Sequence, residues 1–111
     1  MKKFLIVILV LFLTGCSDIN KKVDIEAIMD ENEYIIIDVR TKNEYDEAHI
    51  VGSINVPYDE IDKDINIDKE IVIFVYCRSG ARSSIAFNTL TNLGYTVYDL
   101  GAFDGIDLPK E

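Results

Sequence analysis

Uninterrupted apolar runs alternate along this chain with segments of helical spacing, and the alternation predicts most of its elements. Residues 34–37 (YIII) and residues 71–76 (IVIFVY) are short runs without charge. Runs of this length and composition are typical of strands that are buried on both faces. Residues 53–56 and 95–100 predict two further strands. A fifth short strand, or a turn, is expected near Val23.

The segments between these runs predict helices. In residues 81–93 the apolar positions 85, 86, 90 and 93 have helical spacing, and Gly94 stands where a glycine often ends a helix. Thr41 and Glu44 have the spacing of a capping box, which predicts a short helix through about residue 48.

Two further segments complete this pattern and indicate the fold class. Residues 24–32 have helical spacing with Asp24 as a possible cap, and residues 58–68 predict an acidic, irregular or briefly helical connection. Strands that alternate with helices indicate an α/β domain. We expect a mainly parallel five-stranded sheet that is flanked by helices on both faces.

The first fifteen residues are expected to lie outside that domain. Lys2 and Lys3 precede an apolar run, residues 4–13, that is too short for the roughly 20 residues of a membrane span. A basic start followed by such a run favours a secretory signal. The end of this segment, LTGC, resembles the lipobox of bacterial lipoproteins, and the resemblance implies that Cys16 is acylated. A short uncleaved anchor and an ordinary signal peptide are the alternatives.

The chain therefore divides into a signal peptide (1–15), a lipidated N-terminus and tether (16–22), and one domain (23–111). A total of 111 residues supports one core of this kind. Because acyl chains hold a protein at a membrane surface without spanning it, we expect the domain on the extracytoplasmic face of a bacterial membrane.

Charge and cysteine count exclude several classes of function. Removing residues 1–15 takes away two of the 11 lysines and arginines and leaves 20 acidic residues, a formal charge of −11. A domain so acidic should be repelled by nucleic acid, and lipid rather than a basic patch would bind the membrane. With Cys16 acylated, Cys77 has no cysteine partner for a disulfide or a zinc site, and His49 is the single histidine. We therefore expect no metal and no cofactor.

Cys77 opens the stretch CRSGARS, residues 77–83, between a predicted strand and a predicted helix. Ligands of parallel sheets gather at such junctions. Amide groups at the helix start, together with Arg78 and Arg82, favour a thiolate, and Gly80 lets the backbone approach an anion closely. A buried structural cysteine is the alternative, but two adjacent charges do not suit a dry core. The stretch therefore predicts a reactive or anion-binding cysteine.

Residues 77–83 resemble the active-site loop of single-domain rhodanese sulfurtransferases, Cys-x-x-Gly-x-Arg. Four other segments of the chain resemble, in the same order, further signatures of that family: residues 37–40 (IDVR), 44–45 (EY), 49–57 (HIVGSINVP) and 100–103 (LGAF). The likeness runs from about residue 23 to residue 105. Ala48 and Ala102 stand where the family often has glycine, and the chain has no tryptophan to match the family's closing segment.

The resemblance implies a rhodanese-like fold and a sulfurtransferase. In such a sulfurtransferase, the thiolate of Cys77 would take sulfur from thiosulfate or a persulfide and pass it to a thiol or cyanide. The implied substrate-binding residues are Arg78, Ser79, Gly80, Ala81, Arg82 and Ser83. Arg82 can instead be structural. The expected partners are small sulfur-containing anions and thiols, with a protein acceptor possible, and the expected state is a monomer.

The spacing of the loop bears on rival functions, and four polar residues have expected structural roles. Phosphatases and arsenate reductases on a related fold place five residues between cysteine and arginine, whereas four separate Cys77 from Arg82, which disfavours that chemistry. A membrane-tethered persulfide carrier without turnover, or a sulfide or thiol sensor, stays open. For four polar residues we expect structural roles as ion pairs, caps or hydrogen-bonded groups: Asp38, Arg40, Glu44 and His49.

Overall fold

A computed structural model of the chain describes residues 24–111. The chain divides into two units after Asp30, and each unit is described by itself. Helix α2 (Ile25–Glu31) belongs almost entirely to the first unit, and its start is confirmed by a hydrogen bond from the Ala27 amide to the Asp24 carboxylate, 3.3 Å. Within residues 24–111, no helix has the length and apolar character needed to cross a membrane. The predicted signal, Cys16 and the tether lie outside the described residues.

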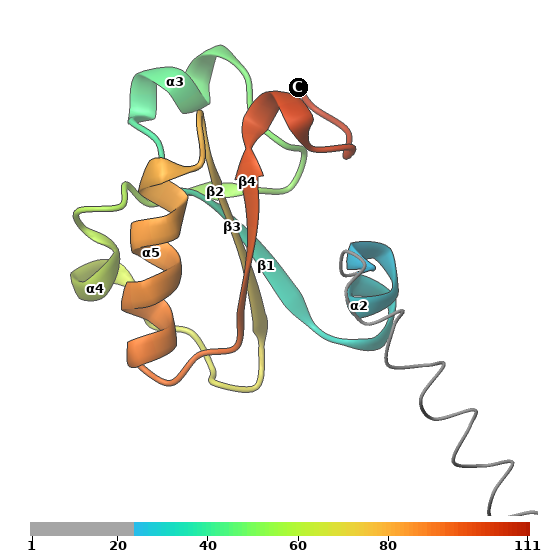
Figure 1. Cartoon of the computed structure of the whole chain (residues 1–111), viewed down its shortest axis with the longest axis vertical. Helices are drawn as coiled ribbons and strands as arrows, with labels where there is room; N and C mark the ends of the chain where they lie inside the picture. Colours follow the sequence, from blue (N-terminus) through green and yellow to red (C-terminus); the bar gives the residue numbers. More distant parts are fainter. Residues whose placement is uncertain (1–23) are drawn as a thin grey trace, which may run out of the picture. The chain divides into compact units, whose positions relative to one another are not determined.

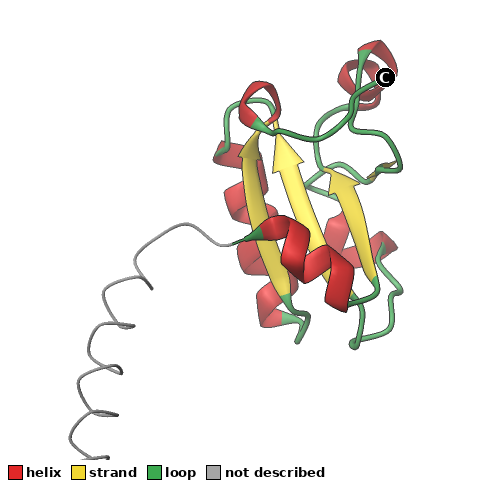
Figure 2. Cartoon of the chain, turned by 90° about the vertical axis from the view of Figure 1, so that its right-hand side faces the viewer, coloured by secondary structure: helices red, strands yellow, loops and turns green. Residues whose placement is uncertain are grey.

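The second unit alternates strands with helices, as the apolar pattern predicts. In chain order the elements are β1 (Tyr34–Asp38), α3 (Lys42–Glu47), β2 (Ile54–Asn55), α4 (Ile61–Asp64), β3 (Val72–Cys77), α5 (Ala81–Asn92), β4 (Val97–Ala102) and the short 3-10 helix η1 (Phe103–Gly105) (Figure 1). The strands lie in the order β2-β1-β3-β4, and every neighbouring pair is parallel. The longer strands accordingly point the same way in Figure 2. An α/β unit with a parallel sheet is confirmed.

The sheet of the described residues has four strands, and the expectation of five is wrong for this part of the chain. The fifth strand was expected near Val23, which lies outside the described residues. The next residue, Asp24, caps a helix, so the chain turns helical at that point instead of extending. Strand β2 is also shorter than expected, because only Ile54 and Asn55 pair with β1.

The core lies between one face of the sheet and two helices. Strand β3 is buried along its whole length, as its six apolar residues predict. Helices α4 and α5 lie together on one side of the strands (Figure 1), and they contribute Ile61, Ala86 and Leu90 to this core. Six strand residues or their neighbours face them: Ile37, Val39, Ile73, Val75, Cys77 and Val97. The sequence therefore buries the cysteine on the helix-covered face.

Helix α5 ends as its glycine predicts, although part of its expected apolar face is exposed. Gly94 has φ +101°, a conformation that glycine adopts at low cost, and its amide bonds to Thr91 while the Tyr95 amide bonds to Leu90. These are the two bonds of a Schellman motif. Of the predicted apolar positions, Ile85 remains 50% exposed, so helical spacing alone overstates the buried face.

Candidate active site

Cys77 is the last residue of β3, where the carboxyl ends of three strands meet. Across the sheet its neighbour is Ala102 of β4, and the preceding Tyr76 pairs with Asp38 of β1. Residues 78–80 form a short turn, and α5 starts directly after it at Ala81. The predicted strand-to-helix junction is therefore present. Cys77 itself is fully buried. Residues 77–83 are called the cradle loop below.

Gly80 shapes the cradle loop around the sulfur. Its φ of +103° lies in the left-handed region, which costs a residue with a side chain free energy. In this conformation the Gly80 amide donates a hydrogen bond to Cys77 Sγ over 2.9 Å. The glycine of the motif is thus needed for its backbone conformation, since a Cβ at this position would meet no atom within 4 Å.

Ser83 supplies two more polar groups to the same sulfur from the first turn of α5. Its amide donates to Cys77 Sγ over 3.3 Å, and its hydroxyl oxygen lies 3.5 Å from that sulfur. The hydroxyl also donates to the carbonyl oxygen of Gly80, 3.1 Å away. The sequence predicts only the amide in this role. The hydroxyl was missed, although a serine in the first turn of the predicted helix after Cys77 is a signal that could have found it.

These groups lower the pKa of the Cys77 thiol. Burial would raise that pKa, but hydrogen bonds from the Ser83 hydroxyl and from the amides of Ser83, Gly80 and Ser79 outweigh it. Donors that point at a sulfur stabilise its anion. The thiolate expected from the sequence is therefore more stable than that of an ordinary cysteine, and hydrogen bonds of the loop are the cause.

The two arginines occupy different environments from those expected. Arg82 is turned toward Glu44 of α3: its Nη1 lies 2.8 Å from Oε1 and its Nη2 lies 3.1 Å from Oε2. The open alternative of a structural Arg82 therefore has direct support. The Arg78 side chain is 73% exposed, and its guanidinium is 4.0 Å from the same carboxylate. Ser79 and Ala81 are also exposed, and Gly80 is half-buried.

Glu44 joins the first turn of α3 to the cradle loop. It completes a capping box with Thr41, which confirms that prediction. Its pKa falls from 4.5 to about 2, chiefly because Arg82 donates to it, while burial opposes the shift and Thr41 adds to it. Glu44 is therefore ionised at neutral pH.

The other polar residues near this edge have the structural roles expected of them. Asp38 and Arg40 form a buried ion pair, with Nη2 and Oδ2 2.6 Å apart, and Arg40 also donates to the carbonyl oxygen of Ala48. The Arg40 guanidinium lies over the ring of Phe103, 4.5 Å from its centre. His49 Nδ1 bonds to the carbonyl oxygen of Tyr45 over 2.8 Å.

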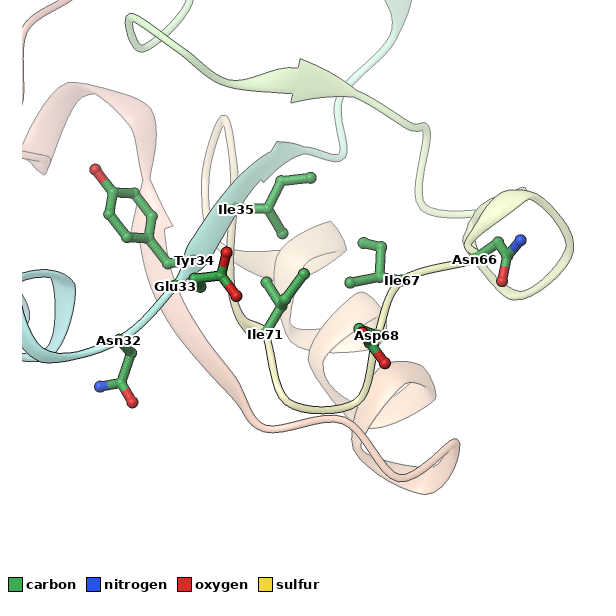
Figure 3. A pocket seen from close by; sticks show the side chains of 8 residues that line it. All are labelled: Asn32, Glu33, Tyr34, Ile35, Asn66, Ile67, Asp68 and Ile71. Carbon is green, nitrogen blue, oxygen red and sulfur yellow. The ribbon is translucent and has the colours of Figure 1, made fainter.

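A hollow lies at the opposite end of the sheet from Cys77. It has a volume of about 540 Å³ and is lined by Asn32, Glu33, Tyr34, Ile35, Asn66, Ile67, Asp68 and Ile71 (Figure 3). These residues stand where β1 begins and just before β3 begins, whereas Cys77 ends β3. In the described part of the chain no three acidic, cysteine or histidine residues are grouped to hold a metal ion. The hollow and the cradle loop therefore lie at opposite ends of β3.

The fold and the cradle loop define a class of protein, and comparison with known proteins agrees with that class. A model of the rhodanese-like domain matches residues 22–106. This chain belongs to the rhodanese-like sulfurtransferase family.

Two relatives from Escherichia coli match most of the domain. The chain is 37% identical over 78 residues to thiosulfate sulfurtransferase PspE of Escherichia coli, which covers 67% of this chain and 75% of PspE. A solved structure described as a rhodanese with anions from E. coli matches with a TM-score of 0.67 and 34% identity, over 70% of this chain and 96% of that one.

Other relatives are longer proteins of which this chain matches a part. It is 38% identical over 61 residues to the putative sulfur carrier protein YrkF of Bacillus subtilis, covering 54% of this chain and 33% of YrkF. It is also 38% identical over 69 residues to a probable molybdopterin-synthase adenylyltransferase of Porphyra purpurea, and this match covers 59% of this chain and 18% of that relative. The domain therefore occurs both nearly alone and within larger proteins.

Proposed function

We propose that this protein is a thiosulfate-type sulfurtransferase that carries sulfane sulfur as a persulfide on Cys77. The observation that carries the proposal is the convergence of the Gly80 and Ser83 donors on one buried sulfur at a strand-to-helix junction. The thiosulfate sulfurtransferase relative supports the same chemistry.

The reaction has two displacement steps that need only the thiolate and the loop. In the first, the Cys77 thiolate attacks the outer sulfur of thiosulfate, a new S–S bond forms, and sulfite leaves with the electron pair of the broken bond. In the second, cyanide or a thiolate attacks the outer sulfur of the persulfide, and the Cys77 thiolate leaves. No net oxidation of the protein occurs over the cycle, and the amide donors stabilise the sulfur anion present before and after it.

The first test is the intact mass of the domain from Ser17 onward after incubation with thiosulfate. We expect the mass of one added sulfur atom, its loss on addition of cyanide, and neither event in Cys77→Ser. Ser84→Ala, at an exposed position of α5, is the matched control and should load normally. An unchanged mass with both thiosulfate and a persulfide donor would falsify the proposal.

The second candidate function is that of a sulfur carrier without turnover, and the similarity to a putative sulfur carrier protein supports this candidate. Steady thiocyanate production from thiosulfate and cyanide supports the enzyme. Loading of one sulfur per protein that then passes only to a thiol or protein acceptor supports the carrier.

We also propose that Cys16 is lipidated and that it anchors the domain on the extracytoplasmic face of a bacterial membrane. The apolar run and the LTGC sequence support this proposal. Full-length protein should stay with membranes in high salt and leave them in detergent, and Cys16→Ser should lose labelling by a fatty acid. Release by salt alone would contradict the anchor.

A further inference from the structure

Glu44 contacts both arginines of the cradle loop, and this position gives it an influence on the charge of the site. Its Oε1 lies 2.8 Å from Arg82 Nη1, and its carboxylate also approaches Arg78 Nη1 at 4.0 Å. The side chains of Glu44 and Arg82 are only 20% and 27% exposed. A pair that is shielded in this way is screened less by salt than a surface pair. The negative charge of Glu44 therefore offsets the positive charge of Arg82.

The charges around the sulfur consequently cancel. Arg78 and Arg82 are cations and Glu44 is an anion, so these three charges and a Cys77 thiolate, when the thiol is ionised for attack, sum to zero. Beyond it, the chain after residue 15 has a formal charge of −11. A small anionic donor thus meets Arg78 as an exposed cation, but neither the site nor the domain provides a positive field that would concentrate dianions.

We propose that Glu44 is a specificity-determining residue that disfavours dianionic sulfur donors relative to singly charged donors of the same shape. The inference rests on the proposed sulfur transfer and names its preferred donor class, which is singly charged thiosulfonates and persulfides. The physical reason is that a Coulomb energy is proportional to the charge of the ligand. Repulsion by Glu44 therefore costs a dianion about twice the free energy that it costs a monoanion.

Thiosulfate and methanethiosulfonate test this inference because they differ by one charge. A methyl group in methanethiosulfonate replaces one oxygen of thiosulfate, and the outer sulfur is attached to the same kind of sulfur centre. Attack by the Cys77 thiolate releases sulfite from the first and methanesulfinate from the second, each with the electron pair of the broken S–S bond. Cyanide then removes the sulfur in both assays, so thiocyanate reports both reactions.

Glu44→Gln removes the charge and leaves an oxygen that can still accept the hydrogen bonds of the Thr41 amide and hydroxyl, since glutamine also serves in a capping box. Asp46→Asn is the matched control, because it removes one charge from the same helix at a side chain that is 53% exposed and pairs with Lys42. We expect Glu44→Gln to raise kcat/KM by about tenfold for thiosulfate and about threefold for methanethiosulfonate, and Asp46→Asn to change either by less than about twofold.

A second measurement compares the native protein with Glu44→Gln at low and high salt. Because salt screens the exposed charges of the domain more than the shielded Glu44, the effect of Glu44→Gln on the ratio of kcat/KM for the two donors should persist at high salt. Equal factors for the two donors in Glu44→Gln, or loss of thiosulfate activity in that variant, would overturn the inference and leave sulfur transfer standing. If neither donor places sulfur on Cys77 in any of the three proteins, the proposed function itself fails, and the inference fails with it.

Discussion

The hydroxyl oxygen of Ser83 lies 3.5 Å from the sulfur of Cys77 and donates a hydrogen bond to the carbonyl oxygen of Gly80. A hydroxyl has one hydrogen. Beside a thiol it can accept the S–H and keep its own hydrogen on Gly80, whereas beside a thiolate it stabilises the sulfur by turning that hydrogen toward it. Ser83 therefore couples the ionisation of Cys77 to the backbone of the cradle loop.

Replacing Ser83 by alanine should make the thiol a weaker acid. The hydroxyl is one of the groups that offset burial and lower the pKa of Cys77, so its loss raises that pKa. The rate of alkylation by iodoacetamide should fall several-fold near neutral pH, and its rise with pH should move to higher pH. Ser84→Ala, which lies next to it at an exposed position, should leave the pH profile unchanged. A profile of Ser83→Ala that coincides with the native one would contradict this role.

Gly80→Ala should destabilise the domain through backbone conformation. At φ +103° an alanine meets no neighbouring atom within 4 Å, so the cost is that of the left-handed region, about 1–2 kcal/mol. Urea denaturation measures the free energy of unfolding. Gly105→Ala is the control, because it has equal space and no positive φ, and it should cost clearly less. Equal losses would show that the conformation of Gly80 carries no special cost.

Asp38→Ala should be among the most destabilising single substitutions near the site. It leaves the Arg40 guanidinium, which is 5% exposed, without its carboxylate, and breaking a buried pair costs about 3–5 kcal/mol. The comparison is Lys42→Ala, which breaks a pair whose side chains are 78% and 53% exposed and should cost less than about 1 kcal/mol. Thermal or urea unfolding of both variants measures the difference, and similar losses would refute the contrast.

The ion pair of Glu44 and Arg82 should make part of the stability depend on acid pH. The pKa of Glu44 falls from 4.5 to about 2 on folding. The contribution of Glu44 to the free energy of unfolding is therefore complete above pH 4.5 and is lost as pH falls toward 2. The native protein should exceed Glu44→Gln by about 1–3 kcal/mol at neutral pH. That difference should shrink across the acid window in denaturation curves. A difference that stays constant down to pH 2 would place the stabilisation elsewhere.

Local patterns predicted the elements whose causes lie within a few residues. The apolar run of residues 71–76 predicts a buried strand, and β3 (Val72–Cys77), which contains all of that run except Ile71, is buried along its whole length. Thr41 and Glu44 form their capping box, and Gly94 ends α5. In each case one turn or one strand contains the whole physical cause.

Features that depend on distant residues were not predicted. Arg82 bonds to Glu44, 38 positions earlier in the chain, because the carboxyl ends of β1 and β3 bring the turns after them together. Sequence spacing shows two cations near a cysteine but not the carboxylate that offsets one of them. Likewise, helical periodicity does not show that Ile85 is 50% exposed, because exposure depends on the elements that pack against the helix.

The complete burial of Cys77 also protects the resting protein from covalent self-association. A disulfide between two copies requires their Cα atoms to approach within about 7 Å, which a cysteine beneath its own loop does not permit without opening that loop. Acquired sulfur lengthens the side chain by about 2 Å, the length of one S–S bond. Burial that limits disulfide formation at the thiol should therefore restrict an acceptor less when it attacks the outer sulfur of the loaded protein.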